Sequence, residues 1–179
     1  MTTVWTIGHS TRALEELVDL LRAHGVDTVV DVRTVPRSRR HPQFEKTALT
    51  ASLPRAAIAY THMPGLGGLR KPRADSPNTG LRSAGLRGYA DYMQTPDFGR
   101  HVMDLITLAA AARVATMCAE ASPSACHRAL LSDALVARGV RVLHIATRGE
   151  PASHVLTPGA QRDGERLRYP PRQGELFSS

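Results

Sequence analysis

The sequence has few cysteines that could cross-link the chain and no apolar run long enough to cross a membrane. Only two of its 179 residues are cysteines, too few for a disulfide framework in a chain of this length. Its longest apolar run, residues 105–112, is far shorter than the roughly 20 residues that span a bilayer. The N-terminus lacks the charged and then apolar pattern of a secretion signal. We therefore expect a cytoplasmic protein with no membrane span.

Lysine and aromatic residues are also scarce. Lys46 and Lys71 are the only lysines, so the net charge of +7 comes almost entirely from arginine. Arginine binds phosphate through a planar fork of donors, which favours an anionic partner, although a genome rich in arginine codons would produce the same bias. The low aromatic content, 4%, leaves few side chains to stack on nucleic-acid bases. The candidates for stacking are Trp5, Tyr60, Tyr89 and Tyr92.

Strand-like and helix-like segments alternate along most of the chain. Short apolar or β-rich runs predict strands at residues 3–8, 27–33, 56–63, 113–120 and 140–145. Helical spacing predicts helices at residues 46–53, 86–95, 97–112 and 126–139, and another that Ser10 or Thr11 caps and Gly25 ends. We expect the helix at residues 97–112 to begin at Asp97. This order predicts a single α/β domain, a mostly parallel sheet flanked by helices in a Rossmann-like three-layer arrangement.

Two stretches depart from this alternation. Glycines and prolines crowd residues 64–85, which predicts a long irregular insertion. From Thr147 onward the periodicity is lost. We therefore expect an α/β domain over residues 1–150 and an Arg/Pro/Gly-rich C-terminal tail over residues 151–179.

Polar side chains follow the predicted strands. In a parallel sheet the functional crevice lies beyond the carboxyl ends of the strands. The residues expected there are Gly8, His9 and Ser10, Asp31 and Arg33, His62, and Cys118 and Glu120. Each has a structural alternative, such as an ion pair between Asp31 and Arg33. Their convergence nevertheless favours a site, with Glu120, Asp31 and His9 as the candidate catalytic residues.

Two basic loops are candidates for holding phosphates. One carries Arg33, Arg37, Arg39 and Arg40, and the other carries Arg70, Lys71 and Arg73 after a glycine-rich run. Glycines permit close backbone approach and guanidinium groups neutralise charge, as in nucleic-acid backbone binding. The glycine-rich run lacks the lysine and hydroxyl of a mononucleotide P-loop, so we predict no ATP binding.

The stretch MCAEASPSACHR, residues 117–128, contains both cysteines. Cys118 and Cys126 are not separated by the two residues of a redox motif, and a strand-end cysteine need not face a helix-start cysteine. A catalytic disulfide and a closed zinc site are therefore disfavoured, and we expect packed rather than reactive cysteines. The helix that starts here can receive an anion, with Cys126, His127 and Arg128 at its first turn. Glu120 at its rim could act as a general acid or base.

These landmarks together resemble a known family. TIGHSTR, DVRTVPRSRRHPQF, GGLR, YADYM and CAEASPSACHR occur in the order seen in the DUF488 family of small α/β proteins, over roughly residues 6–145. The family takes its name from an unknown function. The resemblance implies the fold and a site without naming a reaction. The positions it marks are His9, Asp31, Arg33, Glu120, Cys126, His127 and Arg128.

The C-terminus contains a second resemblance. QGELF, residues 173–177, resembles the pentapeptide by which bacterial polymerases and repair proteins dock on the replication sliding clamp. Gln173, Leu176 and Phe177 would be its anchors, inserted into an apolar pocket from a short extended tail. The resemblance implies the clamp as a partner and places the protein near DNA.

The sequence thus leads to a hypothesis of a DNA-processing, repair-related hydrolase. It would cleave a base from its sugar or a phosphodiester, with Glu120 or Asp31 activating water or stabilising the sugar cation. No cofactor or metal site is expected, although a divalent metal stays open for phosphodiester cleavage. Two alternatives remain: a nucleic-acid or nucleotide-binding module without catalysis, and a thiol enzyme that uses Cys126 or Cys118.

Overall fold

Five parallel strands form the centre of the protein, in a computed structural model that describes residues 1–171. The strands are β1 (Thr3–Gly8), β2 (Thr28–Asp31), β3 (Ala59–His62), β4 (Val114–Cys118) and β5 (Arg141–Ile145). The short β6 (Ala152–Ser153) adds an antiparallel edge, so that the sheet order is β3-β2-β4-β1-β5-β6. The mostly parallel α/β sheet expected from the sequence is confirmed.

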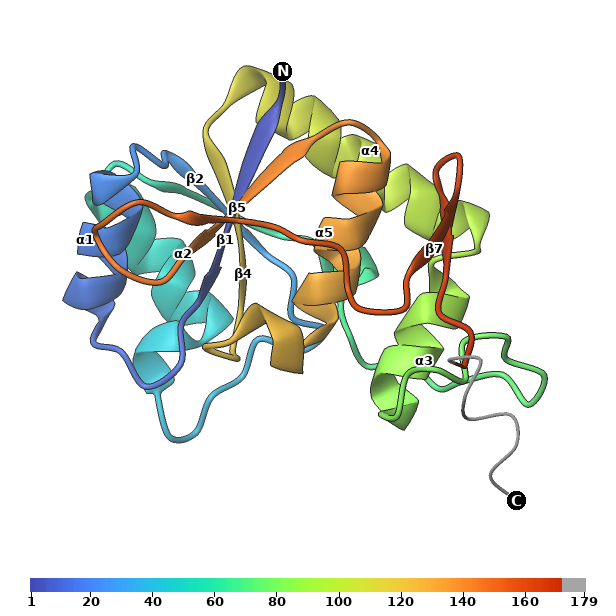
Figure 1. Ribbon diagram of the computed structural model, residues 1–179. Helices are drawn as coiled ribbons and strands as arrows, with labels where there is room; N and C mark the ends of the chain where they lie inside the picture. The colour runs from blue at the N-terminus through green and yellow to red at the C-terminus, as the bar shows by residue number, and fades with distance from the viewer. Residues whose placement is uncertain (172–179) are drawn as a thin grey trace.

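Helices cover both faces of this sheet, which gives three layers (Figure 1). One side holds α1 (Leu14–Ala23) and α2 (Lys46–Arg55). The other side holds α3 (Ala84–Tyr92), α4 (Pro96–Ala111) and α5 (His127–Ala137). Three 3-10 turns, at Pro42–Phe44, Pro64–Leu66 and Pro123–Ala125, lie in the connections. Among residues 1–171, no helix has the length and apolarity to cross a membrane.

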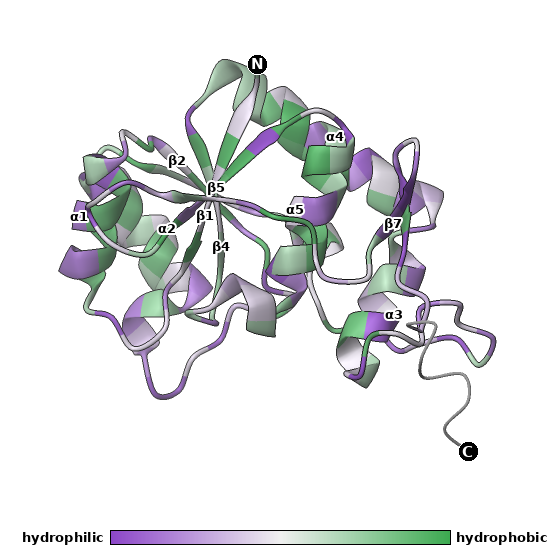
Figure 2. Cartoon of the chain, in the orientation of Figure 1, coloured by the Kyte–Doolittle hydropathy of each residue, from purple (hydrophilic) through white to green (hydrophobic). Residues whose placement is uncertain are grey.

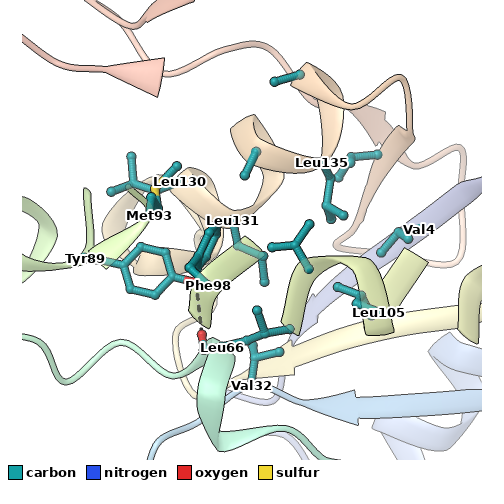
Figure 3. Close-up of a cluster of buried hydrophobic side chains, with 14 of the residues drawn as sticks. Val4, Val32, Leu66, Tyr89, Met93, Phe98, Leu105, Leu130, Leu131 and Leu135 are labelled. Atoms are coloured by element: carbon teal, nitrogen blue, oxygen red, sulfur yellow. Dashed lines mark hydrogen bonds between the residues drawn. The ribbon is translucent and has the colours of Figure 1, made fainter. Parts of the chain in front are cut away.

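Two apolar cores lie against the two faces of the sheet. Side chains alternate along each strand, so Val29 packs toward α1 and α2 whereas Val30 packs toward α4 and α5. The apolar colouring follows the strands and the inward helix faces in Figure 2. In the larger core Tyr89 and Phe98 pack with leucines of α5, and the Tyr89 hydroxyl donates to the carbonyl of Leu66 at 3.0 Å (Figure 3). The α3 and α5 helices are thereby tied to the segment that follows β3.

Two helix starts differ from the sequence prediction. Neither Ser10 nor Thr11 caps α1, because Ser10 has a positive φ of 48° and the helix begins only after Ala13, whose side chain makes no cap. Thr95, not Asp97, caps α4: its hydroxyl accepts from the backbone N–H of Phe98 at 3.3 Å. Several polar residue types can cap a helix, so the sequence alone does not identify which of two nearby residues does so. The path of the preceding loop decides which side chain reaches the free backbone N–H groups.

The segment after β5 is packed against the domain as far as residue 171. It forms β6 and then a hairpin of β7 (Gln161–Asp163) and β8 (Arg166–Arg168). Asp133 of α5 binds it at three points, accepting from His154 Nε2 at 2.7 Å, from the backbone N–H of Thr157 at 2.9 Å and from the Tyr169 hydroxyl at 2.8 Å. His154 Nδ1 in turn lies 2.9 Å from His144 Nε2, and His144 Nδ1 lies 2.6 Å from the Thr6 hydroxyl. A buried polar chain therefore joins this segment to the sheet.

Candidate functional site

The polar residues that follow β1, β2 and β4 meet at one edge of the sheet. The strand order places β4 between β1 and β2, so their carboxyl ends are neighbours. The backbone N–H groups of His9 and Ser10 donate to the carbonyls of Cys118 and Ala119 at 2.9 and 3.0 Å. The turn after β1 is thereby held against the turn after β4. The convergence expected from the strand ends is present.

Asp31 is fully buried and is committed to an ion pair. One carboxylate oxygen accepts from the backbone N–H and Nε of Arg33 at 3.1 and 2.9 Å. The other accepts from Arg33 Nη2 at 2.6 Å and from the Tyr60 hydroxyl at 2.7 Å. Burial, together with the hydrogen bond to this carboxylate, raises the pKa of Tyr60 and keeps its hydroxyl a donor. With all its acceptor sites engaged, Asp31 positions Arg33, and the structure does not support its predicted role as a catalytic base.

His9 is a buried, neutral imidazole in the same network. Its ring stacks on Phe44 with centroids 4.3 Å apart, and Nδ1 donates to its neighbour's carbonyl, that of Ser10, at 2.9 Å. Nε2 is then free to accept from Arg33 Nη1 at 3.3 Å. Burial lowers the pKa of His9 to about 4. His9 therefore helps to hold Arg33, while His62 Nε2 binds the Arg33 carbonyl at 2.8 Å.

A pocket of about 350 Å³ opens beside this network. Its floor and sides combine Arg33, Cys118, Cys126 and His127 with two exposed charged residues, Arg37 and Glu120. Its apolar part consists of Val35, Leu69 and Leu86, of which Val35 is 52% and Leu69 75% exposed. Neither His9 nor Ser10 lines it. Among the described residues around the pocket, Glu120 is the only carboxylate.

A larger cavity, of about 500 Å³, lies at the opposite edge of the sheet. Its walls are Met1, Thr2, Thr3, Trp5, Asp27 and residues 109–113. Asp27 accepts there from the backbone N–H of Arg113 at 3.1 Å, and the Arg113 guanidinium lies 4.8 Å from the Trp5 ring centre. These charged groups already serve the connection between α4 and β4. The smaller pocket is therefore the better candidate site.

The two cysteines face each other at the pocket floor. Cys126 Sγ lies 3.2 Å from Cys118 Sγ, and both residues are buried. Whether they meet was open from the sequence, and they do so because the turn Pro123–Ala125 brings the start of α5 back over the end of β4. Cys126 Sγ also accepts from the backbone N–H of Arg128 at 3.4 Å and so caps α5. Spacing along the chain could not reveal this contact.

His127 is a neutral imidazole on the wall of the pocket. Its Nε2 lies 3.0 Å from the carbonyl oxygen of Val32, and Nδ1 lies 3.4 Å from Cys126 Sγ. Burial lowers the pKa of His127 to about 4. Because Nε2 must donate to the carbonyl, Nδ1 carries no proton and faces Cys126 Sγ, whose own proton is donated to Cys118. His127 is thereby held by main-chain and thiol groups rather than offered as a cation to phosphate.

Arg128 and Arg70 do not reach the pocket as phosphate ligands. Arg128 is 1% exposed, and its Nη2 donates to the carbonyls of Glu120 and Ala121 at 3.1 Å each. Arg70 donates to two carbonyls of the preceding glycine-rich turn and lies 3.6 Å from the Tyr92 ring centre. Both were predicted to bind phosphate. In the structure both fix loops, because unpaired carbonyls in a folded turn compete for guanidinium donors.

The glycine-rich run serves packing. A Cβ atom added at Gly68 would lie 2.4 Å from His127 Nδ1, and one at Gly67 would lie 2.7 Å from the backbone of Thr34. These glycines allow the turn after β3 to press against the pocket wall. Arg37, Arg39 and Arg40 are exposed on the loop after β2, so the basic surface expected for a polyanion remains on that loop.

Comparison with known proteins agrees with this architecture. The family described as "Domain of unknown function DUF488" matches residues 13–135, more than half of the chain. The chain belongs to the DUF488 family. Neither a curated protein nor a solved structure matches it. The DUF488 match includes Asp31, Arg33, Glu120 and Cys126, and therefore three of the strand and helix ends that form the pocket.

Several residues of this DUF488 site were missed from the sequence. Phe44, which stacks on His9, had no part in the predicted site, and Gly8 was expected at the strand end without its role of letting the Glu120 backbone approach β1. Tyr60 was considered only for base stacking, whereas it binds Asp31. The GH pair after a β-rich run was the one available signal for Gly8. Within residues 1–171, no group of three or more histidine, cysteine or acidic side chains converges as metal ligands do.

Proposed function

We propose that the protein is a DNA-processing hydrolase that removes a damaged or modified base from its sugar. The observation that carries the proposal is the pocket, whose lining combines one exposed carboxylate, Glu120, with apolar side chains and with the polar groups of Arg33, Arg37 and His127. Its volume, about 350 Å³, falls within the range of small-ligand sites. A base extruded from the helix needs apolar faces to stack on and polar groups to bind its edge.

Base–sugar cleavage suits the available acid groups. Departure of a base leaves positive charge on the sugar, which one carboxylate can stabilise while it also orients the attacking water. Phosphodiester cleavage by metals uses several acidic ligands. Because Asp31 is engaged by Arg33 and Tyr60, Glu120 is the carboxylate left for the reaction.

The loop after β2 would hold the DNA backbone. Arg37 lies both on this loop and on the pocket wall, and Arg39 and Arg40 are exposed beside it. Arginines that contact phosphates position the duplex without reading its sequence. This arrangement would place an extruded nucleotide between the basic loop and Glu120.

Glu120→Gln tests the proposal. The Glu120 side chain is exposed and makes no hydrogen bond within residues 1–171, so the variant should fold normally. On a duplex with a base that the wild type removes, we expect a fall in the rate of abasic-site formation of about 100-fold or more. Binding measured by fluorescence anisotropy should not change. Glu15→Gln, an exposed change on α1, is the matched control and should behave as wild type.

The outcomes separate the proposal from the alternatives. If wild type binds DNA but yields no product on any panel of deaminated, alkylated and oxidised bases, the chain is a binding module and the hydrolase proposal fails. If Glu120→Gln retains full activity, the carboxylate assignment fails.

We extend the proposal to recruitment by the sliding clamp. Its support is the QGELF pentapeptide, whose anchors Gln173, Leu176 and Phe177 lie outside the described residues. Removing residues 173–179 should abolish binding to immobilised clamp and leave base removal intact. Unchanged clamp binding by the truncated chain would contradict recruitment through this peptide.

A further inference from the structure

We propose that Cys118 and Cys126 are a redox-active dithiol, which a small peroxide oxidises to an intramolecular disulfide through the pocket. This inference stands apart from the proposed hydrolysis, since it depends on the two thiols and on Arg128. It assigns a covalent chemistry to the pocket floor that base removal does not use.

The geometry brings the two sulfur atoms to the point of bonding. They lie 3.2 Å apart, and a disulfide bond is about 2.0 Å long, so an approach of roughly 1 Å is needed. Cys118 ends β4, a central strand of the sheet, and Cys126 caps α5. The turn between them contains an exposed stretch, residues 119–122. Both cysteines also line the pocket, which gives a small oxidant a path to them.

The charge environment favours one thiolate. Arg128 is almost fully buried, its Nε has no hydrogen-bond partner, and no carboxylate pairs with it within residues 1–171. A buried cation without a counter-ion is strongly unfavourable. A thiolate at Cys118 would supply the missing negative charge. Arg128, in the first turn of α5, therefore favours an ionised thiol at Cys118, the last residue of β4.

The pKa values of the pair divide their roles. The hydrogen bond donated by Cys126, followed by the charge of Arg128, lowers the pKa of Cys118 to about 7. The same hydrogen bond and burial raise the pKa of Cys126. Cys118 is thus the nucleophile near neutral pH, and Cys126 retains its proton until the second step.

The reaction balances with hydrogen peroxide as the oxidant. The Cys118 thiolate attacks one peroxide oxygen, the O–O bond breaks and hydroxide leaves, which produces a sulfenic acid at Cys118. Cys126 Sγ then attacks that sulfur, the S–O bond breaks and the S–S bond forms. The Cys126 proton leaves with the departing oxygen as water. Each peroxide is reduced as the two thiols are oxidised to one disulfide.

The test uses the full chain, whose two cysteines make the readout direct. Treatment with a stoichiometric amount of hydrogen peroxide should remove both titratable thiols in the denatured protein and lower the intact monomer mass by two hydrogen atoms. Dithiothreitol should restore both thiols. Peptide mapping should find the bond between Cys118 and Cys126. Ser122→Ala, in the exposed turn between them, is the matched control and should oxidise as wild type does.

Single variants distinguish the two thiols. Cys126→Ser should stop at the sulfenic acid, trapped at Cys118 by a 1,3-dione probe, whereas Cys118→Ser should lose the rapid reaction with peroxide. The intact mass reports these outcomes even if a variant is less stable than wild type. Retention of both thiols, a bond between chains instead of within one, or equally rapid oxidation of both single variants would overturn the proposal.

Discussion

At the scale of single residues, burial separates two carboxylates that the sequence treats alike. Asp31 and Glu120 both follow strands and were both predicted to be catalytic. Asp31 is fully buried and accepts four hydrogen bonds, whereas the Glu120 side chain is exposed at the pocket. The alternative of an ion pair between Asp31 and Arg33 was available from their spacing. Which carboxylate keeps its lone pairs for chemistry depends on neighbours contributed by β3, which are distant in sequence.

Gly8 is the residue that lets Glu120 approach β1. A Cβ atom at Gly8 would lie 1.8 Å from the carbonyl oxygen of Glu120. Gly8→Ala should therefore displace the turn after β4 and lower the free energy of unfolding by about 1–3 kcal/mol, as overpacking does. Urea denaturation measures this change, and activity should fall with it because Glu120 moves.

Gly99→Ala is the control for this prediction. Gly99 lies inside α4 and a Cβ atom there would meet nothing within 4 Å. Alanine favours a helix over glycine, so this variant should be neutral or gain up to about 1 kcal/mol. Equal stability of Gly8→Ala and wild type would contradict the close approach.

At the scale of elements, the sequence pattern predicted each parallel strand and each α-helix of residues 1–171, with bounds shifted by a few residues. The predicted strand over residues 27–33 became Thr28–Asp31, and the backbone N–H of Arg33 donates to the Asp31 carboxylate instead of to a neighbouring strand. Helix starts were less accurate: Ser10, Thr11 and Asp97 do not cap. Caps depend on the loop path, whereas periodicity depends on burial of a face, and burial is the stronger constraint.

The segments without periodicity were the hardest to interpret. Residues 64–85 do form an irregular insertion. The Asp91 carboxylate of α3 holds this insertion in place, accepting from the Arg73 backbone N–H, the Ser76 hydroxyl and the Asn78 amide at 2.7–2.8 Å. The end of the described chain contains β6, at the edge of the main sheet, and the β7–β8 hairpin, which is a separate two-stranded sheet. Strands of two or three residues carry no periodic signal, and long-range contacts with Asp133 hold them in place.

At the scale of the whole molecule, buried neutral imidazoles make stability depend on pH. Burial lowers the pKa of His9, His127 and His144 from an ordinary 6.5 to about 4. Between these values the unfolded chain binds more protons than the folded one, so stability is complete above pH 6.5 and falls as the pH drops toward 4. Because the three imidazoles act in the same direction, their contributions to this pH dependence add.

Chemical denaturation at a series of pH values measures this dependence. We expect the free energy of unfolding to fall steadily between pH 6.5 and pH 4, and His127→Asn to show a shallower slope whatever its absolute stability. A flat profile over this range would contradict the neutral state of the buried imidazoles.

The sequence by itself determined the α/β class, the three layers, the strand ends at which polar residues gather and the DUF488 family. These follow from periodicity and local motifs, which are properties of neighbouring residues. Only the tertiary structure decided which of those residues remain available. In the folded protein Asp31 is paired with Arg33, and Cys118 contacts Cys126. Arg128 is buried and has no carboxylate partner in the described chain. Such contacts depend on burial and on distances between elements that are far apart in the chain. The spacing of residues along the sequence predicts neither of these.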